Sequence, residues 1–213
     1  MDKECVIFAG GDMSENIPNI ELRVKSADYI ICADSGLKHA QRLGITPDII
    51  VGDFDSYTGK LPDNSEIIRS IPEKDDTDTI MAVRKAAELG CRQIVLYGAL
   101  GGSRFEHTVA NIQTLLFAKE LGCILTIIDK SVICLQYNDG EEYYYQRSEN
   151  GTYMSVFSLS ETTEIEYLDG VKYPLENYTM KNSYPIGVSN EITETCAVLK
   201  IKSGTALIIL TDK

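Results

Sequence analysis

Short apolar runs alternate with helix-like segments through the first part of the chain. Strands are predicted where apolar residues stand together between turn-forming residues, at residues 5–9, 28–33, 45–51, 66–71, 93–97 and 123–128. Helices are predicted where apolar residues recur every three or four positions before a glycine, at residues 37–43, 77–89 and 105–121. Because strands that alternate with helices usually pair in parallel, we expect an α/β domain with a mostly parallel sheet flanked by helices.

The pattern changes near Leu135, after which helical periodicity disappears and tyrosines become frequent. Short strands separated by turn residues are predicted, at residues 152–159, 164–168, 171–175, 195–201 and 206–210. Asp169-Gly170 is a typical hairpin turn between two of them. We therefore expect residues 1–136 to form the α/β domain and residues 137–213 to form a second, all-β domain of sandwich or barrel type.

Two clusters of carboxylates are the first candidates for chemistry. Asp53 and Asp55 follow a predicted strand, and their side chains point to the same side of the chain if the backbone stays extended. Asp75 and Asp78 are three residues apart at the start of a predicted helix and lie on the same helix face. Four carboxylates brought together would repel unless they held a cation, and oxygen ligands suit Mg²⁺ carrying a polyphosphate. Structural alternatives remain open, since the first cluster could be a solvated turn and the second could cap the helix.

Two further polar signatures directly follow predicted strands, at the edge where parallel sheets bind ligands. One is Asp34-Ser35-Gly36, and the other is the glycine-rich run Gly98-Ala99-Leu100-Gly101-Gly102-Ser103-Arg104. Free backbone N–H groups there, at a helix N-terminus, could receive phosphate, although the run is neither a Walker A loop nor a dinucleotide fingerprint. Arg104 and His107 would add donors on the same turn. His107 could instead be structural, and His39 is expected to be structural or at the surface.

Composition narrows the classes of partner. The chain has 213 residues and a net charge of -12, which argues against a general affinity for nucleic acids or anionic membranes. No segment approaches the ~20 apolar residues that span a bilayer, and no leader-like N-terminus is present, so we expect a cytoplasmic protein. The six cysteines stand singly in apolar surroundings and are expected to be buried, reduced thiols.

Taken together, these segments resemble the thiamine pyrophosphokinase (thiamine diphosphokinase) family. The residues that carry the resemblance stand in order along most of the chain: Cys32-Ala33-Asp34-Ser35-Gly36, Pro47-Asp48-Ile49-Ile50-Val51-Gly52-Asp53-Phe54-Asp55-Ser56, Lys74-Asp75-Asp76-Thr77-Asp78, residues 98–107 with Asn111, and Gly187-Val188-Ser189-Asn190-Glu191. The last run would by itself be explained equally well by a β-turn.

The resemblance implies an enzyme that transfers the diphosphate of ATP to the hydroxyl of thiamine, giving thiamine diphosphate and AMP. It implies that Asp53, Asp55, Asp75 and Asp78 are the catalytic residues and hold Mg²⁺. It implies nucleotide binding by Asp34, Ser35, Gly36, Lys74, Gly101, Gly102, Arg104 and His107, and thiamine binding by Ser189, Asn190 and Glu191. It also implies a homodimer whose active sites lie between subunits.

The sequence departs from the family pattern in the glycine-rich run. The family more usually has Gly-Gly-Arg-x-Asp-His, whereas here Ser103 precedes Arg104 and Glu106 replaces Asp; the chain also has no Trp to stack on thiamine. Three alternatives stay open: a diphosphotransferase for another hydroxyalkyl heterocycle such as a pterin, a non-catalytic thiamine- or nucleotide-binding regulator, and an unrelated nucleotide-binding α/β protein. Retention of all four carboxylates speaks against the regulator, because a binding module has no reason to tolerate their repulsion.

Overall fold

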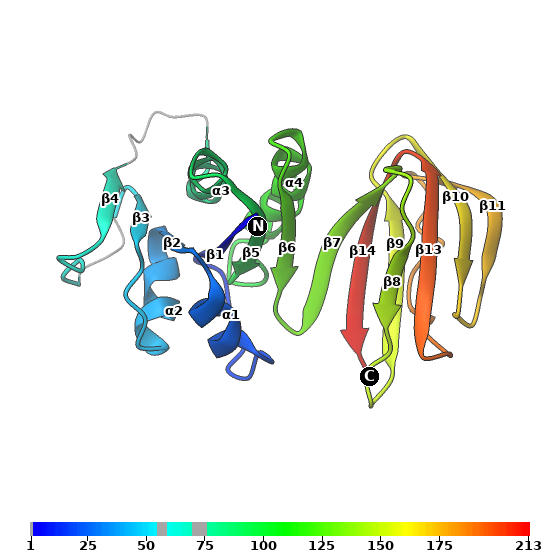
Figure 1. The fold of residues 1–213 in the computed structure, drawn as a ribbon, viewed down its shortest axis with the longest axis horizontal. Helices are drawn as coiled ribbons and strands as arrows, with labels where there is room; N and C mark the ends of the chain where they lie inside the picture. The colour runs from blue at the N-terminus through cyan, green and yellow to red at the C-terminus, as the bar shows by residue number, and fades with distance from the viewer. Residues whose placement is uncertain (1, 55–58, 70–75) are drawn as a thin grey trace. The chain divides into compact units, whose positions relative to one another are not determined.

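The computed structural model describes residues 2–54, 59–69 and 76–213 and separates into two compact units, Met1–Asp129 and Lys130–Lys213 (Figure 1). The division falls seven residues before the boundary placed from the sequence. The reason is β7 (Ser131–Tyr137), which pairs along its whole length with β14 (Thr205–Asp212) and so belongs to the second unit. No helix among the described residues is long and apolar enough to cross a membrane.

A parallel sheet forms the centre of the first unit, as the sequence predicted. All five strand pairings described in it are parallel. In sheet order the strands are β6 (Ile124–Ile128), β5 (Cys91–Tyr97), β1 (Lys3–Phe8), β2 (Tyr29–Ala33), β3 (Ile49–Gly52) and β4 (Glu66–Arg69). The register aligns Phe8 with both Cys32 and Tyr97, so the carboxyl ends of the three central strands lie together.

Helices cover both faces of this sheet. The helical elements are α1 (Ile20–Ser26), the 3-10 turn η1 (Asp34–Gly36), α2 (Leu37–Arg42), α3 (Asp78–Glu88) and α4 (Phe105–Glu120). α3 packs against α4 on one face, and α1 and α2 pack against the central strands from the other (Figure 1). α1 was not predicted, because only Ile20 of its seven residues is buried and its apolar pattern is weak.

The long helices form where local signals agree. In α3 the buried residues Thr79, Ala82, Val83 and Ala86 recur every three or four positions, and Thr77 caps the helix by accepting a hydrogen bond from Ile80 N at 3.2 Å. Gly90, with φ of +84°, follows the end of the helix as its left-handed cap residue. These features explain why the predicted and observed bounds of α3 nearly coincide.

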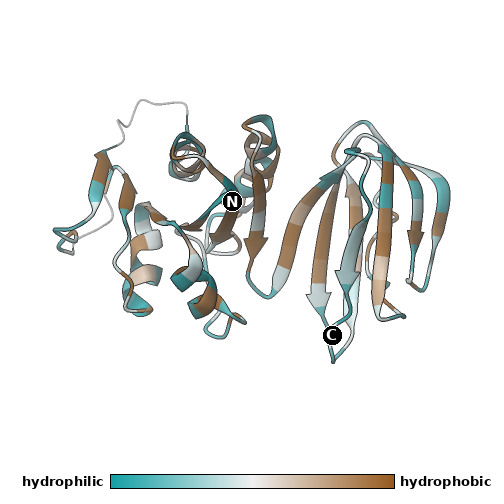
Figure 2. Ribbon diagram, viewed as in Figure 1, coloured by the Kyte–Doolittle hydropathy of each residue, from teal (hydrophilic) through white to brown (hydrophobic). Residues whose placement is uncertain are grey.

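The second unit consists of two antiparallel sheets that enclose one apolar core, which confirms the expected all-β domain. In one sheet the strands lie in the order β12 (Asn190–Glu191), β9 (Thr152–Ser158), β14 and β7. In the other they lie in the order β11 (Leu175–Lys181), β10 (Thr162–Asp169), β13 (Cys196–Ser203) and β8 (Tyr143–Gln146). Alternate residues of β9 are buried, as expected for a strand with one face on a core. Figure 2 shows the hydrophobic character of β6, β7 and β14.

One predicted strand of the second unit was wrong. Residues 170–174 connect β10 to β11, and among them only Val171 makes an isolated bridge, to Ile192, whereas Leu175 is the first residue of β11. The hairpin itself is present, because Leu168 pairs with Leu175. Its connection is therefore longer than the two-residue turn that Asp169-Gly170 suggested. The side chain of Asn190 explains why: it binds the backbone of Tyr173 and holds this connection away from strand pairing.

Candidate active site

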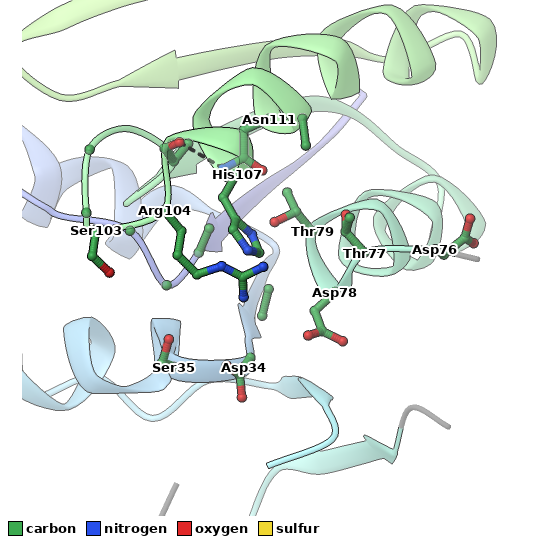
Figure 3. A pocket seen from close by; sticks show the side chains of 18 residues that line it. Asp34, Ser35, Asp76, Thr77, Asp78, Thr79, Ser103, Arg104, His107 and Asn111 are labelled. Atoms are coloured by element: carbon green, nitrogen blue, oxygen red, sulfur yellow. Dashed lines mark hydrogen bonds between the residues drawn. The ribbon is translucent and has the colours of Figure 1, made fainter. Parts of the chain in front are cut away.

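A cleft of about 320 Å³ lies at the carboxyl ends of β1, β2 and β5, entirely within the first unit. Four segments line it: the β1 end, the β2 end with η1, the start of α3, and the β5 end with the start of α4 (Figure 3). The polar lining residues are Asp34, Ser35, Asp76, Thr77, Asp78, Thr79, Ser103, Arg104, His107 and Asn111. Seven of the eight nucleotide-binding candidates lie in described residues, and all but Gly36 line this cleft.

Close backbone packing shapes the floor of the cleft. A Cβ on Gly36 would lie 2.0 Å from the carbonyl oxygen of Phe8, and one on Gly10 would lie 2.1 Å from Ser35 Oγ. Gly36 does not line the cleft. A glycine is required at this position because η1 lies directly against the end of β1. This contact places Asp34 and Ser35 at the cleft wall.

Asp34 carries a polar atom that no other described residue satisfies. Its Oδ1 is buried and has no hydrogen-bond partner among the described residues, and its φ of +46° lies in the left-handed region. A buried carboxylate oxygen without a donor is costly, and a non-glycine residue at positive φ adds strain. A cation or a donor of a bound ligand would satisfy this oxygen.

The glycine-rich run is held by side chains that the sequence did not identify. Gly102 N donates to Asp12 Oδ2 at 2.8 Å, and Gly101 N donates to Thr108 Oγ1 at 3.1 Å. Asn111, which is buried, donates to the carbonyl of Ala99 at 2.8 Å. The N–H groups of Gly101 and Gly102, which we expected to be free for phosphate, thus already have acceptors.

Arg104 and His107 are exposed and extend from the start of α4 toward the space bounded by Asp34 and Asp78 (Figure 3). Arg104 Nε donates to Glu106 Oε1 at 2.8 Å, and this hydrogen bond holds the pKa of Glu106 below its ordinary value. The contact leaves the two terminal nitrogens of the guanidinium group available to a ligand. Glu106, the departure from the family pattern, therefore supports Arg104 locally.

Only part of the proposed carboxylate set lies in described residues. Asp78 stands in the first turn of α3 and lines the cleft, and Asp53 follows β3. Asp55, Asp75 and Lys74 lie outside the described residues. The extended backbone assumed between Asp53 and Asp55 is not observed, because Phe54 has φ of +63°. Among the described residues no group of three potential ligands is close enough to hold a metal.

Asp76 has a structural role. It lines the cleft, and its carboxylate binds Arg84 Nη2 at 2.8 Å, while Arg84 also lies over the ring of Phe117 with 5.0 Å to the centroid. These contacts join the start of α3 to α4. His39 is structural as expected: its Nε2 lies 2.8 Å from the carbonyl oxygen of Gly11.

The candidate thiamine-binding residues lie together at the edge strand of the second unit. Ser189, with φ of +56°, leads into β12, and its N–H donates to Ser155 Oγ at 2.9 Å. The amide of Asn190 accepts from Tyr173 N at 3.1 Å and donates to Tyr173 O at 2.9 Å. Glu191 forms an ion pair with Lys213, which lowers the pKa of Glu191. The run is thus more than a plain turn, because its side chains organise the surrounding loop.

The sequence did not reveal that Asp12 and Thr108 hold the glycine-rich run, nor that Thr77 lines the cleft. The signal at Asp12 was slight, a carboxylate after Gly10-Gly11 at a strand end. In the sequence, Thr77 was recognised only as a possible cap of the following helix. The contact that gives Asp12 its role joins residues 90 positions apart.

Two family models match the chain, one for each unit. The "Thiamin pyrophosphokinase, catalytic domain" matches residues 20–126, and the "Thiamin pyrophosphokinase, vitamin B1 binding domain" matches residues 143–208. A curated relative, thiamine pyrophosphokinase of Bacillus subtilis, is 30% identical over 97% of this chain and 98% of its own length.

Solved structures agree with this match. The crystal structure of the Bacillus subtilis thiamine pyrophosphokinase has a TM-score of 0.86 and 28% identity, covering 99% of this chain and 100% of that one. The Geobacillus thermodenitrificans thiamin pyrophosphokinase has a TM-score of 0.80 and 27% identity, covering 99% and 98%. With both units matched in sequence and fold, the chain belongs to the thiamin pyrophosphokinase family.

Proposed function

We propose that this protein transfers the terminal diphosphate of ATP to the hydroxyl of thiamine, giving thiamine diphosphate and AMP. The observation that carries the proposal is the match of both units, in order, to the catalytic and vitamin B1 binding domains of one family. The cleft supports it physically, because donors from Arg104 and His107 face carboxylates from Asp34 and Asp78 across one space. Such a space suits a polyphosphate that is bound on one side by the donors of Arg104 and His107.

The nucleotide end of the reaction is assigned to the α4 side of the cleft. Arg104 has two terminal nitrogens directed to the cleft and can bind phosphate oxygens in a forked geometry. Ser35 and His107 offer further donors, and the uncapped N-terminus of the 16-residue α4 favours negative charge. These groups would orient the β-phosphorus for attack by the thiamine hydroxyl and stabilise the charge of the departing AMP.

The carboxylates are assigned to Mg²⁺ and to the proton of the nucleophile. Asp53, Asp55, Asp75 and Asp78 are the proposed ligands, and the Oδ1 of Asp34, which has no hydrogen-bond partner among the described residues, is a further oxygen that fits a hard cation. When bound, Mg²⁺ would neutralise charge on the transferred diphosphate. One of the carboxylates accepts the hydroxyl proton, because the thiamine oxygen must lose it as the new P–O bond forms.

The acceptor end is assigned to the second unit. Ser189, Asn190 and Glu191 offer a hydroxyl, an amide and a carboxylate near β12, groups that match the donors and acceptors of an aminopyrimidine edge. One N–H of Asn190 remains for a ligand after the contact with Tyr173 O. We propose a homodimer in which these residues complete active sites between subunits.

One assay tests the function directly. The purified protein is incubated with ATP, Mg²⁺ and thiamine, and nucleotides and thiamine esters are separated by chromatography. We expect AMP and thiamine diphosphate in equal amounts, and none without thiamine. Formation of ADP with thiamine monophosphate would contradict diphosphate transfer, and turnover with a hydroxymethylpterin but not with thiamine would assign a different acceptor.

A further inference from the structure

The glycine loop, residues 98–104, is attached to the segment that follows β1 at three successive points. Gly11 N donates to the carbonyl of Gly98 at 2.7 Å, Asp12 and Leu100 form an antiparallel bridge, and Asp12 Oδ2 accepts from Gly102 N at 2.8 Å. The first two contacts join backbone to backbone and do not depend on side-chain identity. The third depends on the carboxylate of Asp12.

The loop needs such attachment because its backbone is intrinsically free. Gly98, Gly101 and Gly102 have φ values of +64°, +73° and +83°, and glycine loses more conformational entropy on ordering than any other residue. Thr108 and Asn111 hold the α4 side of the loop through Gly101 N and Ala99 O. Among the described side chains, Asp12 is the one that engages Gly102, two residues before Arg104.

Asp12 acts from outside the cleft. Gly10 and Gly11 line the cleft and Asp12 does not, and the carboxylate of Asp12 accepts from the backbone of Gly102. Its own position is fixed through Gly11, whose carbonyl oxygen lies 2.8 Å from His39 Nε2. A carboxylate that accepts from a backbone N–H makes a charge-assisted hydrogen bond, which is stronger than one between neutral groups.

We propose that Asp12 is a positioning residue, which fixes the Gly101-Gly102 turn so that Arg104 faces the cleft before the nucleotide binds. The proposal rests on the proposed function, in which Arg104 binds the phosphates of ATP. Without Asp12, the turn would be ordered only when the nucleotide binds. The conformational entropy lost in that step would weaken the affinity for the nucleotide.

The first test measures the loop in the free protein and needs no substrate. Amide hydrogen exchange at Gly102 is followed by NMR in the wild type, in Asp12→Ala and in Asp12→Asn. We expect exchange to accelerate at least about tenfold in the alanine variant, because a hydrogen bond to a charged group is lost. Asparagine keeps an acceptor oxygen and should restore most of the protection. Unchanged exchange in Asp12→Ala would overturn the proposal.

The second test uses steady-state kinetics. In Asp12→Ala we expect KM for ATP to rise about tenfold while kcat falls by less than about threefold, since the loop must be ordered on binding. Asp12→Asn should restore KM, and Glu15→Ala, which removes an exposed acidic residue from the same segment, should leave both constants unchanged. An unchanged KM in Asp12→Ala, or an equal rise in Glu15→Ala, would overturn the positioning role. Absence of thiamine-dependent turnover in the wild type would instead contradict the proposed function and leave the exchange result standing.

Discussion

Asp53 and Asp78 are the two proposed metal ligands that lie in described residues, and they come from different elements. Asp53 follows β3, and Asp78 begins α3. Because each would act electrostatically on the transferred diphosphate, Asp53→Asn and Asp78→Asn should each lower kcat by at least about 100-fold. Initial rates at saturating ATP and thiamine measure this.

The same two variants should keep the fold, because replacing one of several like charges relieves repulsion. Their melting temperatures should therefore stay close to that of the wild type. Asp63→Asn is the matched control, since Asp63 is an exposed carboxylate that pairs with Lys60 at 2.7 Å. Near-normal turnover in either test variant would show that the metal ligands are misassigned.

At the scale of elements, the contact between η1 and β1 determines where the cleft wall stands. A side chain at position 36 would press on the backbone carbonyl of Phe8, whereas one at position 10 would meet the hydroxyl of Ser35, which can rotate. Gly36→Ala should therefore lower the free energy of unfolding by about 3 kcal/mol. Gly10→Ala should cost about 1 kcal/mol, the price of an altered serine rotamer.

Urea unfolding of both variants, followed by circular dichroism, tests the difference. The two substitutions add the same methyl group at one strand junction, so each is the control for the other. Equal losses of stability in the two variants would contradict the close approach of η1 to β1. A loss of activity in Gly36→Ala beyond its loss of folded protein would reflect displacement of Asp34 and Ser35.

At the scale of the molecule, the thiols of the buried Cys32 and the half-buried Cys134 link stability to pH. Burial raises the pKa of Cys32 from 9.0 to about 12 and that of Cys134 to about 11. Between pH 9.0 and these pKa values, the thiols lose their protons in the unfolded chain but keep them in the folded protein. The stabilisation from these thiols is therefore fully present below pH 9.0 and is lost as the pH rises. Each thiol contributes a slope on the order of 1 kcal/mol per pH unit in that window.

This slope can be isolated by a variant. The free energy of unfolding is measured at about pH 7, 9 and 10.5 for the wild type and for Cys32→Ala. Whatever the alanine costs in packing, it should flatten the fall above pH 9, because one thiol that ionises only on unfolding has been removed. Parallel curves for the two proteins would show that Cys32 does not contribute to the alkaline loss of stability.

The proposed homodimer also belongs to this scale. Large apolar side chains are exposed on the second unit, among them Ile186 at 54% and Val188 at 52%, and exposed apolar side chains of this kind are candidates for an interaction surface. Val188→Asp should shift the protein toward monomer in sedimentation velocity, since a charge would be buried in the interface. Leu22→Asp is the control, because Leu22 is 65% exposed on α1. A monomeric wild type would contradict the dimer.

The sequence by itself determined the alternation of strands and helices in the first unit, the change to strands alone in the second, and the family. These features depend on local periodicity, on glycines after helices and on motifs at strand ends, all of which are properties of neighbouring residues. Where local signals were weak the prediction failed: α1, β7 and β8 were not predicted, and residues 171–174 do not form a strand.

Only the tertiary structure decided which groups meet. Asp12 and Gly102 are 90 residues apart, and the strand register that brings β1 beside β5 cannot be read from either segment alone. That register brings the carboxylate of Asp12 to the N–H of Gly102 in the glycine loop. Contacts between distant strand ends depend on pairing across the whole sheet, and a linear pattern of apolar and polar residues does not encode them.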